Sequence, residues 1–218
     1  PGDYELLRPR ILRLAYHCQG TDPAIDSFLS DSDLRILTGW NQASDYVRER
    51  GGKPVDVGFS ISEIFSYSGE LKSPRSIAVM PRRGREAIDE FLFSHPRLRA
   101  RVIDQMTEDE TAEAMKTSQF FLASAHGEWL GLPALEAMAA GCVVLSVPVR
   151  GGMQFLKSGE NCLVGQPRDL SRLLHEASTD YESLVPLATR GMQTAQQFAP
   201  SRFRAKLSEA IDAGVLSW

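Results

Sequence analysis

The sequence predicts an α/β protein built on a parallel sheet, and three observations support this prediction. From residue 75 onward, short apolar runs alternate with helical patterns, which is typical of a parallel sheet with helices on both faces. The composition, 43% hydrophobic and 24% charged, is that of a protein able to bury such a core. Loops rich in Gly, Pro or charge follow three of the predicted strands, at the sheet edge where ligands bind in this class.

The first 72 residues contain fewer predicted elements. The apolar runs 11–16 and 34–38 are predicted strands, and 55–59 is a third. Asn41 is predicted to cap a helix that ends at the glycine pair 51–52. The serine-rich stretch 60–73 is weakly periodic, and we interpret it as a linker.

The rest of the chain is regular. Thr107 and Glu110 have the spacing of a capping box, and Asp169 is predicted to cap a later helix. Pro200 should separate the last two helices. The predicted strands are 77–80, 101–103, 120–123, 142–147 and 162–164. The predicted helices are 85–94, 107–117, 132–140, 153–157, one from Asp169, 181–198 and 201–213.

Charge and cysteine content exclude several classes of protein. The net charge of −4 argues against binding to nucleic acid that is driven by charge. Cys18, Cys142 and Cys162 are far apart, which fits neither a disulfide framework nor a zinc site and predicts a cytoplasmic location. Apolar runs are shorter than the roughly 20 residues that span a membrane. Peripheral association with the inner face of a membrane stays open.

The stretch AHGEWLGLPALEAMAAG, residues 125–141, combines two carboxylates with a helix start. Glu128 lies in the loop and Glu136 about one turn into the predicted helix, whose amino end attracts anions such as a diphosphate. Gly131 permits close approach of a ligand. Carboxylates also bind paired hydroxyl groups, so the stretch predicts half of a sugar-nucleotide pocket. The alternative is that Glu136 only complements the helix dipole, worth about 0.3–1 kcal/mol, and that Glu128 is solvated.

The run SQFFLASAHGEWLGLPALEAMAAGCVVLSVPVRGG resembles the donor-site signature of GT-B glycosyltransferases, especially the retaining family four (group 1). The later SGENCLVGQPRDLSRLL and PSRFRAKLSEAI resemble further segments of that family, so the resemblance spans roughly residues 76–211. The residues that carry the central motif are Ser124, Glu128, Gly131, Glu136, Gly141 and the pair Gly151-Gly152.

The resemblance implies roles for individual residues. Glu136 would bind the nucleotide ribose and Glu128 the transferred sugar. Arg82 and Arg83 would neutralise the diphosphate leaving group, because guanidinium groups are always charged and form bidentate hydrogen bonds to phosphate oxygens. The implied catalytic residues are Glu128, Arg82 and Arg83. The implied donor-binding residues are Glu136, Leu130, Gly131, Leu132, Pro133, His126, Gly151 and Gly152.

The resemblance also implies a domain organisation: residues 1–72 as part of an acceptor-side Rossmann-like domain with a linker, 73–200 as the donor domain, and 201–218 as a closing helix. Because two complete domains would need a longer chain, we expect a fragment of a longer enzyme or a trimmed relative. His17 ends a predicted strand, where some relatives have a catalytic histidine; a structural role is the other interpretation.

The predicted function is transfer of a sugar from a nucleoside-diphosphate sugar to a glycan, lipid or protein acceptor. The resemblance implies retention of configuration and a reaction without metal or cofactor. Two alternatives stay open. One is a non-catalytic module that binds nucleotide sugars or serves assembly, and the other is an epimerase of the GT-B fold.

Overall fold

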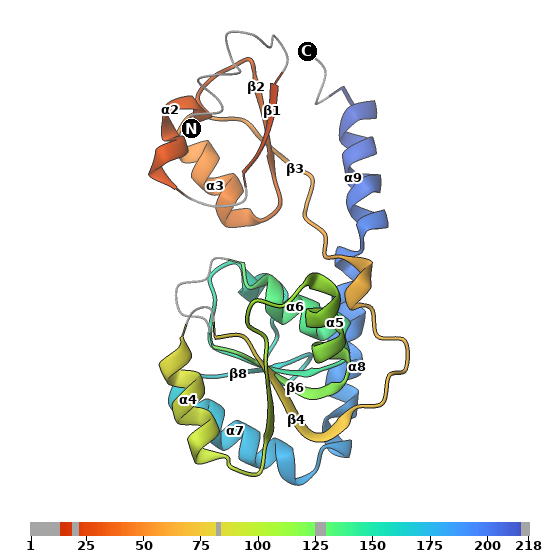
Figure 1. Ribbon diagram of the computed structural model, residues 1–218. Coiled ribbons are helices and arrows are strands. Elements are labelled where there is room, and N and C mark those ends of the chain that lie inside the picture. Colours follow the sequence, from red (N-terminus) through yellow and green to blue (C-terminus); the bar gives the residue numbers. More distant parts are fainter. Residues whose placement is uncertain (1–13, 19–21, 82–83, 125–129, 215–218) are drawn as a thin grey trace. The chain divides into compact units, whose positions relative to one another are not determined.

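The computed structural model describes residues 14–18, 22–81, 84–124 and 130–214 (Figure 1). The chain forms two compact units. The first unit comprises the residues up to Ser60 and those from Pro200 onward, and the second unit is Ile61–Ala199. The domain boundaries predicted after residues 72 and 200 stay predictions.

The first unit contains a parallel sheet of three strands in the order β1-β2-β3, namely Leu14–Cys18, Leu34–Thr38 and Pro54–Asp56. In β2, Leu34, Ile36 and Thr38 are buried and alternate with half-buried residues. Helices α2 (Asp26–Leu29) and α3 (Asn41–Glu49) belong to this unit. Trp40 occupies the N-cap position of α3, so the prediction that Asn41 caps this helix is wrong by one residue.

The last helix, α9 (Pro200–Asp212), also belongs to the first unit. It begins at Pro200, as the predicted break requires. The ring of Phe203 lies 6.4 Å from the ring of His17, centroid to centroid. A Cβ built on Gly58 would lie 3.5 Å from the amine of Lys206.

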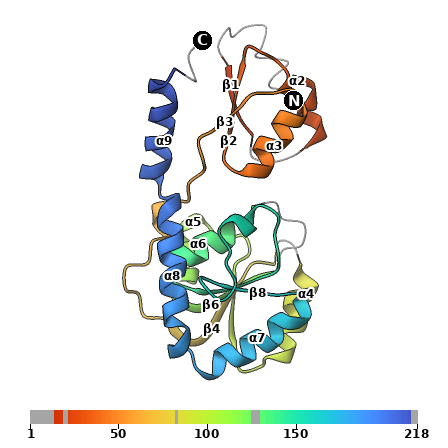
Figure 2. The same cartoon turned by 180° about the vertical axis from the view of Figure 1, so that it is seen from behind.

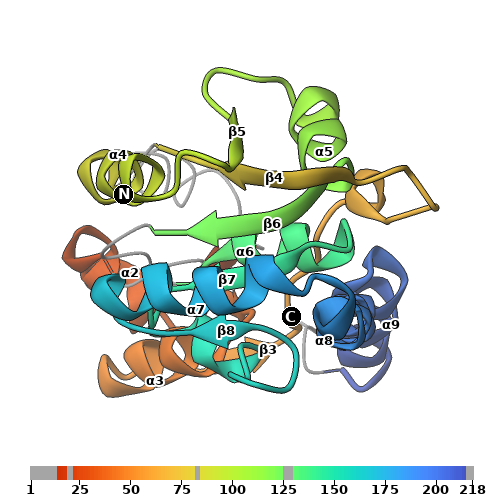
Figure 3. The ribbon, with the colours of Figure 1, turned by 90° about the horizontal axis from the view of Figure 1, so that it is seen from below.

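The second unit contains five parallel strands in the order β5-β4-β6-β7-β8 (Figure 3). These strands are β4 (Ser73–Val79), β5 (Arg99–Val102), β6 (Ser118–Ala123), β7 (Val143–Ser146) and β8 (Leu163–Val164). The prediction of a parallel α/β sheet is confirmed. Phe120, Phe121 and Leu145 are fully buried in its central strands, where a doubly covered parallel sheet requires apolar side chains.

Helices cover both faces of this sheet, with α4 and α7 on one face and α5 and α6 on the other (Figures 1 and 2). Helix α8 packs on α6, where Gly191 lies against the side chain of Met138. The bounds are α4 (Arg85–Ser94), α5 (Glu108–Lys116), α6 (Leu132–Ala139), α7 (Pro167–Thr179) and α8 (Val185–Ala195). Gln166 is the N-cap of α7, so Asp169 lies in its first turn and is not the predicted cap.

The segment 61–72, interpreted from the sequence as a linker, is part of the second unit. Ile61 and Phe65 are 7% and 3% exposed, and Phe65 ends a short 3-10 helix, η2 (Glu63–Phe65), that packs on α5 and α6. The amide of Tyr67 donates to the carbonyl of Ala139 at 3.0 Å. These contacts correct the linker interpretation, because Ile61 and Phe65 are buried and anchor the stretch to the second unit.

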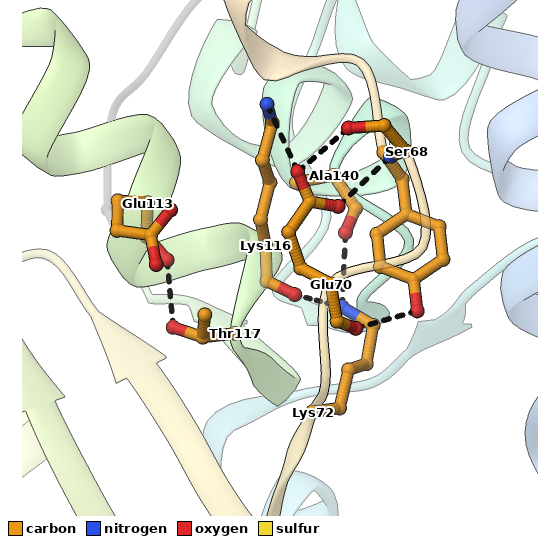
Figure 4. Close-up of polar contacts among 8 residues, drawn as sticks. Ser68, Glu70, Lys72, Glu113, Lys116, Thr117 and Ala140 are labelled. Atoms are coloured by element: carbon orange, nitrogen blue, oxygen red, sulfur yellow. Dashed lines mark hydrogen bonds and ion pairs between the residues drawn. The ribbon is translucent and has the colours of Figure 1, made fainter.

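Lys72 connects this segment by hydrogen bonds to the carboxyl ends of α5 and α6 (Figure 4). Its ammonium donates to the carbonyls of Lys116, Ser118 and Ala140 at 3.0, 2.8 and 2.9 Å. Burial lowers the pKa of this amine, while Cys142 and Glu70 act in the opposite direction. Carbonyls at the end of a helix have no partner within the helix, so Lys72 supplies donors that α5 and α6 lack.

Glu70 is held in the same cluster (Figure 4). Its carboxylate accepts hydrogen bonds from the amide and the hydroxyl of Ser68, both at 2.8 Å, and lies 3.4 Å from the amine of Lys116. Desolvation by itself raises the pKa of Glu70, but the hydrogen bonds from Ser68, from its own amide and from Lys116 outweigh it and lower the pKa to about 2.

Candidate functional site

The loops that follow β4, β6 and β7 lie at the carboxyl edge of the second unit's sheet and contact one another. A Cβ built on Gly84 would lie 2.6 Å from the carbonyl oxygen of Ser124. A Cβ on Gly131 would lie 3.1 Å from Cγ2 of Val149, and one on Gly152 would lie 2.9 Å from the carbonyl oxygen of Leu130. The structure therefore brings together Leu130, Gly131 and Gly152 of the predicted site.

Helix α6 begins at this edge with a backbone that favours glycine. Its N-cap, Gly131, has a φ of 75° in the left-handed region and provides no side-chain cap. Pro133 lies in the first turn, as predicted, and the amide of Ala134 donates to the carbonyl of Gly131 at 3.0 Å. No side chain caps the amino end of α6, and the partial positive charge of this helix end attracts an anion.

Glu136 lies one turn into α6, as predicted. It is half-buried between the buried residues Leu135 and Ala137. Ala134, Ala137 and Ala140 are fully buried, so small side chains allow α6 to lie close to the sheet. The arrangement places a carboxylate near a helix start at the edge where parallel sheets bind ligands.

Helix α4 begins at the same edge in a similar way. Gly84, its N-cap, has a φ of 87° and makes no side-chain cap hydrogen bond. Strands β4 and β6 are neighbours in the sheet, so α4 and α6 both begin next to the centre of the sheet edge. Two helix amino ends without side-chain caps therefore adjoin the loops of the candidate site.

Four of the predicted site residues lie outside the described residues: Arg82, Arg83, His126 and Glu128. Their roles stay predictions.

Two other predicted site residues lie within the described part of the chain. Gly151 is buried and is the N-cap of a short 3-10 helix, η3 (Gly152–Gln154), that replaces the longer helix predicted over 153–157. Leu132 is 37% exposed at the first position of α6.

His17 occupies the fourth position of β1 in the first unit. Burial lowers the pKa of its imidazole, so a larger share of the ring is neutral at pH 7 than for an exposed histidine. Its ring neighbour, Phe203, comes from α9. The structural and the catalytic interpretation of His17 both stay open.

Two further residues belong to the site: Ser124, which is part of the sequence motif but has no predicted role there, and Val149, for which the sequence predicts no role. Val149 is 6% exposed and fills the space beside Gly131 and Gly152. Ser124 is 3% exposed and directly follows β6. Its place after an apolar strand was visible in the sequence, whereas its contact with the start of α4 depends on the pairing of β4 with β6.

Residues 96–194 match the family model described as "Glycosyl transferases group 1". This segment is a glycosyltransferase group 1 domain. It contains α6 and the loops around it, which carry the predicted donor-site motif. A search of curated proteins gives no match.

Solved structures of low sequence identity share the fold of the chain. Sucrose-phosphate synthase from Thermosynechococcus elongatus has a TM-score of 0.80 at 15% identity, covering 98% of this chain and 71% of that chain. Anabaena HepE in complex with UDP has a TM-score of 0.75 at 14% identity, covering 92% and 72%. The pneumococcal O-GlcNAc transferase GtfA, in complex with UDP and GlcNAc, has a TM-score of 0.68 at 16% identity, covering 93% and 53%.

These likenesses extend over both units, beyond the glycosyltransferase group 1 domain. The chain therefore has the GT-B fold, with Rossmann-like parallel sheets in both units. The prediction of the family and of the fold is confirmed. None of the helices in the described part of the chain is long and apolar enough to cross a membrane.

Proposed function

We propose that this protein transfers a sugar from a nucleoside-diphosphate sugar to an acceptor, with retention of configuration and without a metal or cofactor. The observation that carries the proposal is the meeting of the α6 start with the glycine loop after β7, one turn from Glu136, inside a glycosyltransferase group 1 domain. Backbone amides there are suited to hold phosphate oxygens, and Glu136 to accept hydrogen bonds from the ribose hydroxyls.

The chemistry requires stabilisation of negative charge as the bond between sugar and diphosphate breaks. Preorganised donors supply this stabilisation in most transfer reactions of this kind. In the proposal, the amino end of α6 and the guanidinium groups of Arg82 and Arg83 act on the leaving diphosphate, and Glu128 binds the transferred sugar. His126, Leu132 and Gly151 complete the donor site.

A sugar linked to UDP is the first candidate for the donor substrate. HepE and GtfA are both described in complex with UDP, and another HepE structure is in complex with UDP-glucose. The acceptor, which we propose to be a glycan, lipid or protein, would meet the donor in the cytoplasm, including the inner face of a membrane.

One Asp-x-Asp triplet, Asp31-Ser32-Asp33, occurs in the sequence. The carboxylate of Asp31 accepts the amide of Asp33 at 2.9 Å, in the turn that precedes β2. This turn lies at the amino end of a parallel strand, opposite the edge where ligands bind in such sheets. Its place supports a structural role and the proposal of a metal-independent reaction, which predicts full activity in EDTA.

Calorimetry with UDP-glucose, GDP-mannose and ADP-glucose tests the proposal. We expect one of them to bind and the free nucleoside diphosphate to be released when an acceptor, or water in its place, takes the sugar. Binding without any release would identify a non-catalytic nucleotide-sugar module. Absence of binding to all three would reject the donor site.

A further inference from the structure

Ser124 has an unusual hydroxyl group. The residue is 3% exposed, and its Oγ has no hydrogen-bond partner among the described residues. A buried polar group left without a partner destabilises the fold, and the great majority of such groups in proteins are paired. The position of Ser124 therefore needs an explanation other than packing.

The hydroxyl of Ser124 lies at the start of helix α4. A Cβ built on Gly84 would lie 3.6 Å from Ser124 Oγ and 2.6 Å from its carbonyl oxygen. Gly84 is the N-cap of α4, a helix of ten residues, and leaves its amino end without a side-chain cap. The absence of a Cβ at Gly84 is thus what allows a polar hydroxyl and a helix amino end to adjoin each other.

A hydroxyl and the first amides of a helix share one preferred partner, an anion with several acceptor oxygens. The helix amino end carries about half a positive charge, and the hydroxyl can donate one hydrogen bond. The place of both groups, at the carboxyl edge between β4 and β6, is where a parallel sheet binds ligands. A phosphate group meets all of these conditions.

We propose that Ser124 Oγ and the amino end of α4 bind a phosphate group of the donor nucleotide. The proposal rests on the proposed function and deepens it, because it adds a second helix amino end to the one at α6. The hydroxyl donates to a phosphate oxygen, and the amides of the first turn of α4 face the same group. The hydroxyl gains its missing partner only when the nucleotide binds.

Ser146 provides a matched control on the neighbouring strand. It pairs with Ala123 in the sheet, is fully buried, and donates from its hydroxyl to the carbonyl of Val147 at 2.8 Å. The two serines thus differ in whether the hydroxyl has a partner in the protein, within the part of the chain that the structure describes.

The experiment compares the full chain with its variants Ser124→Ala and Ser146→Ala. Melting temperatures are measured without ligand, and affinities for UDP, GDP, ADP and inorganic pyrophosphate are measured by calorimetry. We expect Ser124→Ala to melt at the same temperature as the unmodified chain or higher, and to bind its nucleotide about tenfold to a hundredfold more weakly. Ser146→Ala should melt lower and bind the nucleotide with unchanged affinity.

Two results would overturn the inference alone: a Ser124→Ala variant that binds the nucleotide within about twofold of the unmodified chain, or one that melts as low as Ser146→Ala. The second result would mean that the hydroxyl has a partner in the free protein. If the unmodified chain binds none of the nucleotides and no pyrophosphate, the proposed function fails together with the inference.

Discussion

At the scale of single residues, the candidate site depends on glycines that no other residue replaces easily. Gly84 and Gly131 have positive φ angles, and each lies against a neighbouring loop. Neither provides a side chain to cap its helix, so no cap side chain stands between the amino end of α4 or α6 and a ligand. At both positions glycine serves two purposes: it adopts the left-handed backbone, and it leaves the helix amino end without a side-chain cap.

Glu136→Gln tests the role of the carboxylate on α6. A carboxylate that accepts hydrogen bonds from a ribose diol contributes about 1.5–3 kcal/mol, so the variant should bind UDP about tenfold to a hundredfold more weakly. Calorimetry with UDP and with its 2′,3′-dideoxy analogue measures this. The variant and the unmodified chain should bind the analogue equally. A variant that binds UDP as tightly as the unmodified chain would show that Glu136 does not contact the ribose.

Gly84→Ala tests the contact between the α4 start and Ser124. A left-handed φ costs an alanine about 1–2 kcal/mol, and here the methyl group would also overlap a backbone oxygen. Gly69→Ala is the matched control, because Gly69 has a φ of 103° with no atom within 4 Å of the added Cβ. Urea unfolding should show a loss of stability at least about 1 kcal/mol larger for Gly84→Ala. Equal losses would mean that the loop adjusts freely.

Part of this site could be predicted from the sequence, and part could not. The helix start around Gly131 and the place of Glu136 followed from Pro133, the small residues and the glycine at the end of the helix. The contact between Gly84 and Ser124 could not be predicted, because these residues are 40 positions apart and meet only through the pairing of β4 with β6. Local patterns carry no signal for such a meeting.

At the scale of elements, the segment 61–72 holds the carboxyl ends of α5 and α6. Lys72→Met removes the donor of the Lys116 and Ala140 carbonyls at these ends and of the Ser118 carbonyl at the start of β6. Because buried carbonyls without partners are costly, the variant should lose about 2–3 kcal/mol of stability in urea unfolding. Lys157→Met is the control, since Lys157 is exposed and its ammonium donates to the carbonyl of Met153 at 3.3 Å, a long hydrogen bond. It should change stability by less than about 0.5 kcal/mol.

Glu70 makes the stability of this segment depend on pH. Its pKa falls from 4.5 to about 2 in the folded protein, so the stabilisation is present above pH 4.5 and is lost as the pH falls toward 2. Glu70→Gln should therefore cost about 1–3 kcal/mol at pH 7, and the difference should shrink between pH 4.5 and 2.

Unfolding in urea at a series of pH values measures this difference. Glu90→Gln, an exposed carboxylate on α4, serves as the control. A difference between Glu70→Gln and the unmodified chain that stays constant down to pH 2 would contradict the assignment.

Local sequence patterns were sufficient to predict some helices and strands correctly. Helix α4 and strand β2 have the predicted bounds, and the capping box of Thr107 and Glu110 is present at α5. The short helices over Pro23–Leu29 were not predicted, because they are too short for a helical period to be visible. Ile61 and Phe65 were missed for the same reason: the apolar residues of this short stretch are scattered among polar ones and show no clear period.

At the scale of the whole molecule, every described residue of the proposed donor site belongs to the second unit. A ligand stabilises the parts that it must find folded, so UDP should slow hydrogen exchange chiefly in peptides from residues 61–199. The strands β4, β6 and β7 and the starts of α4 and α6 should show the largest protection by mass spectrometry. Stronger protection confined to β1–β3 would place the nucleotide elsewhere.

The two ends of the second unit meet. The amide of Ile61 donates to the carbonyl of Phe198 at 3.1 Å, so the polypeptide enters and leaves this unit at nearly the same point. Domains whose termini are adjacent tolerate excision and transplantation. Residues 61–199 therefore have the layout of an inserted domain that can be excised. A short turn joining Ser60 to Pro200 would connect the rest of the first unit, including α9, into one continuous chain.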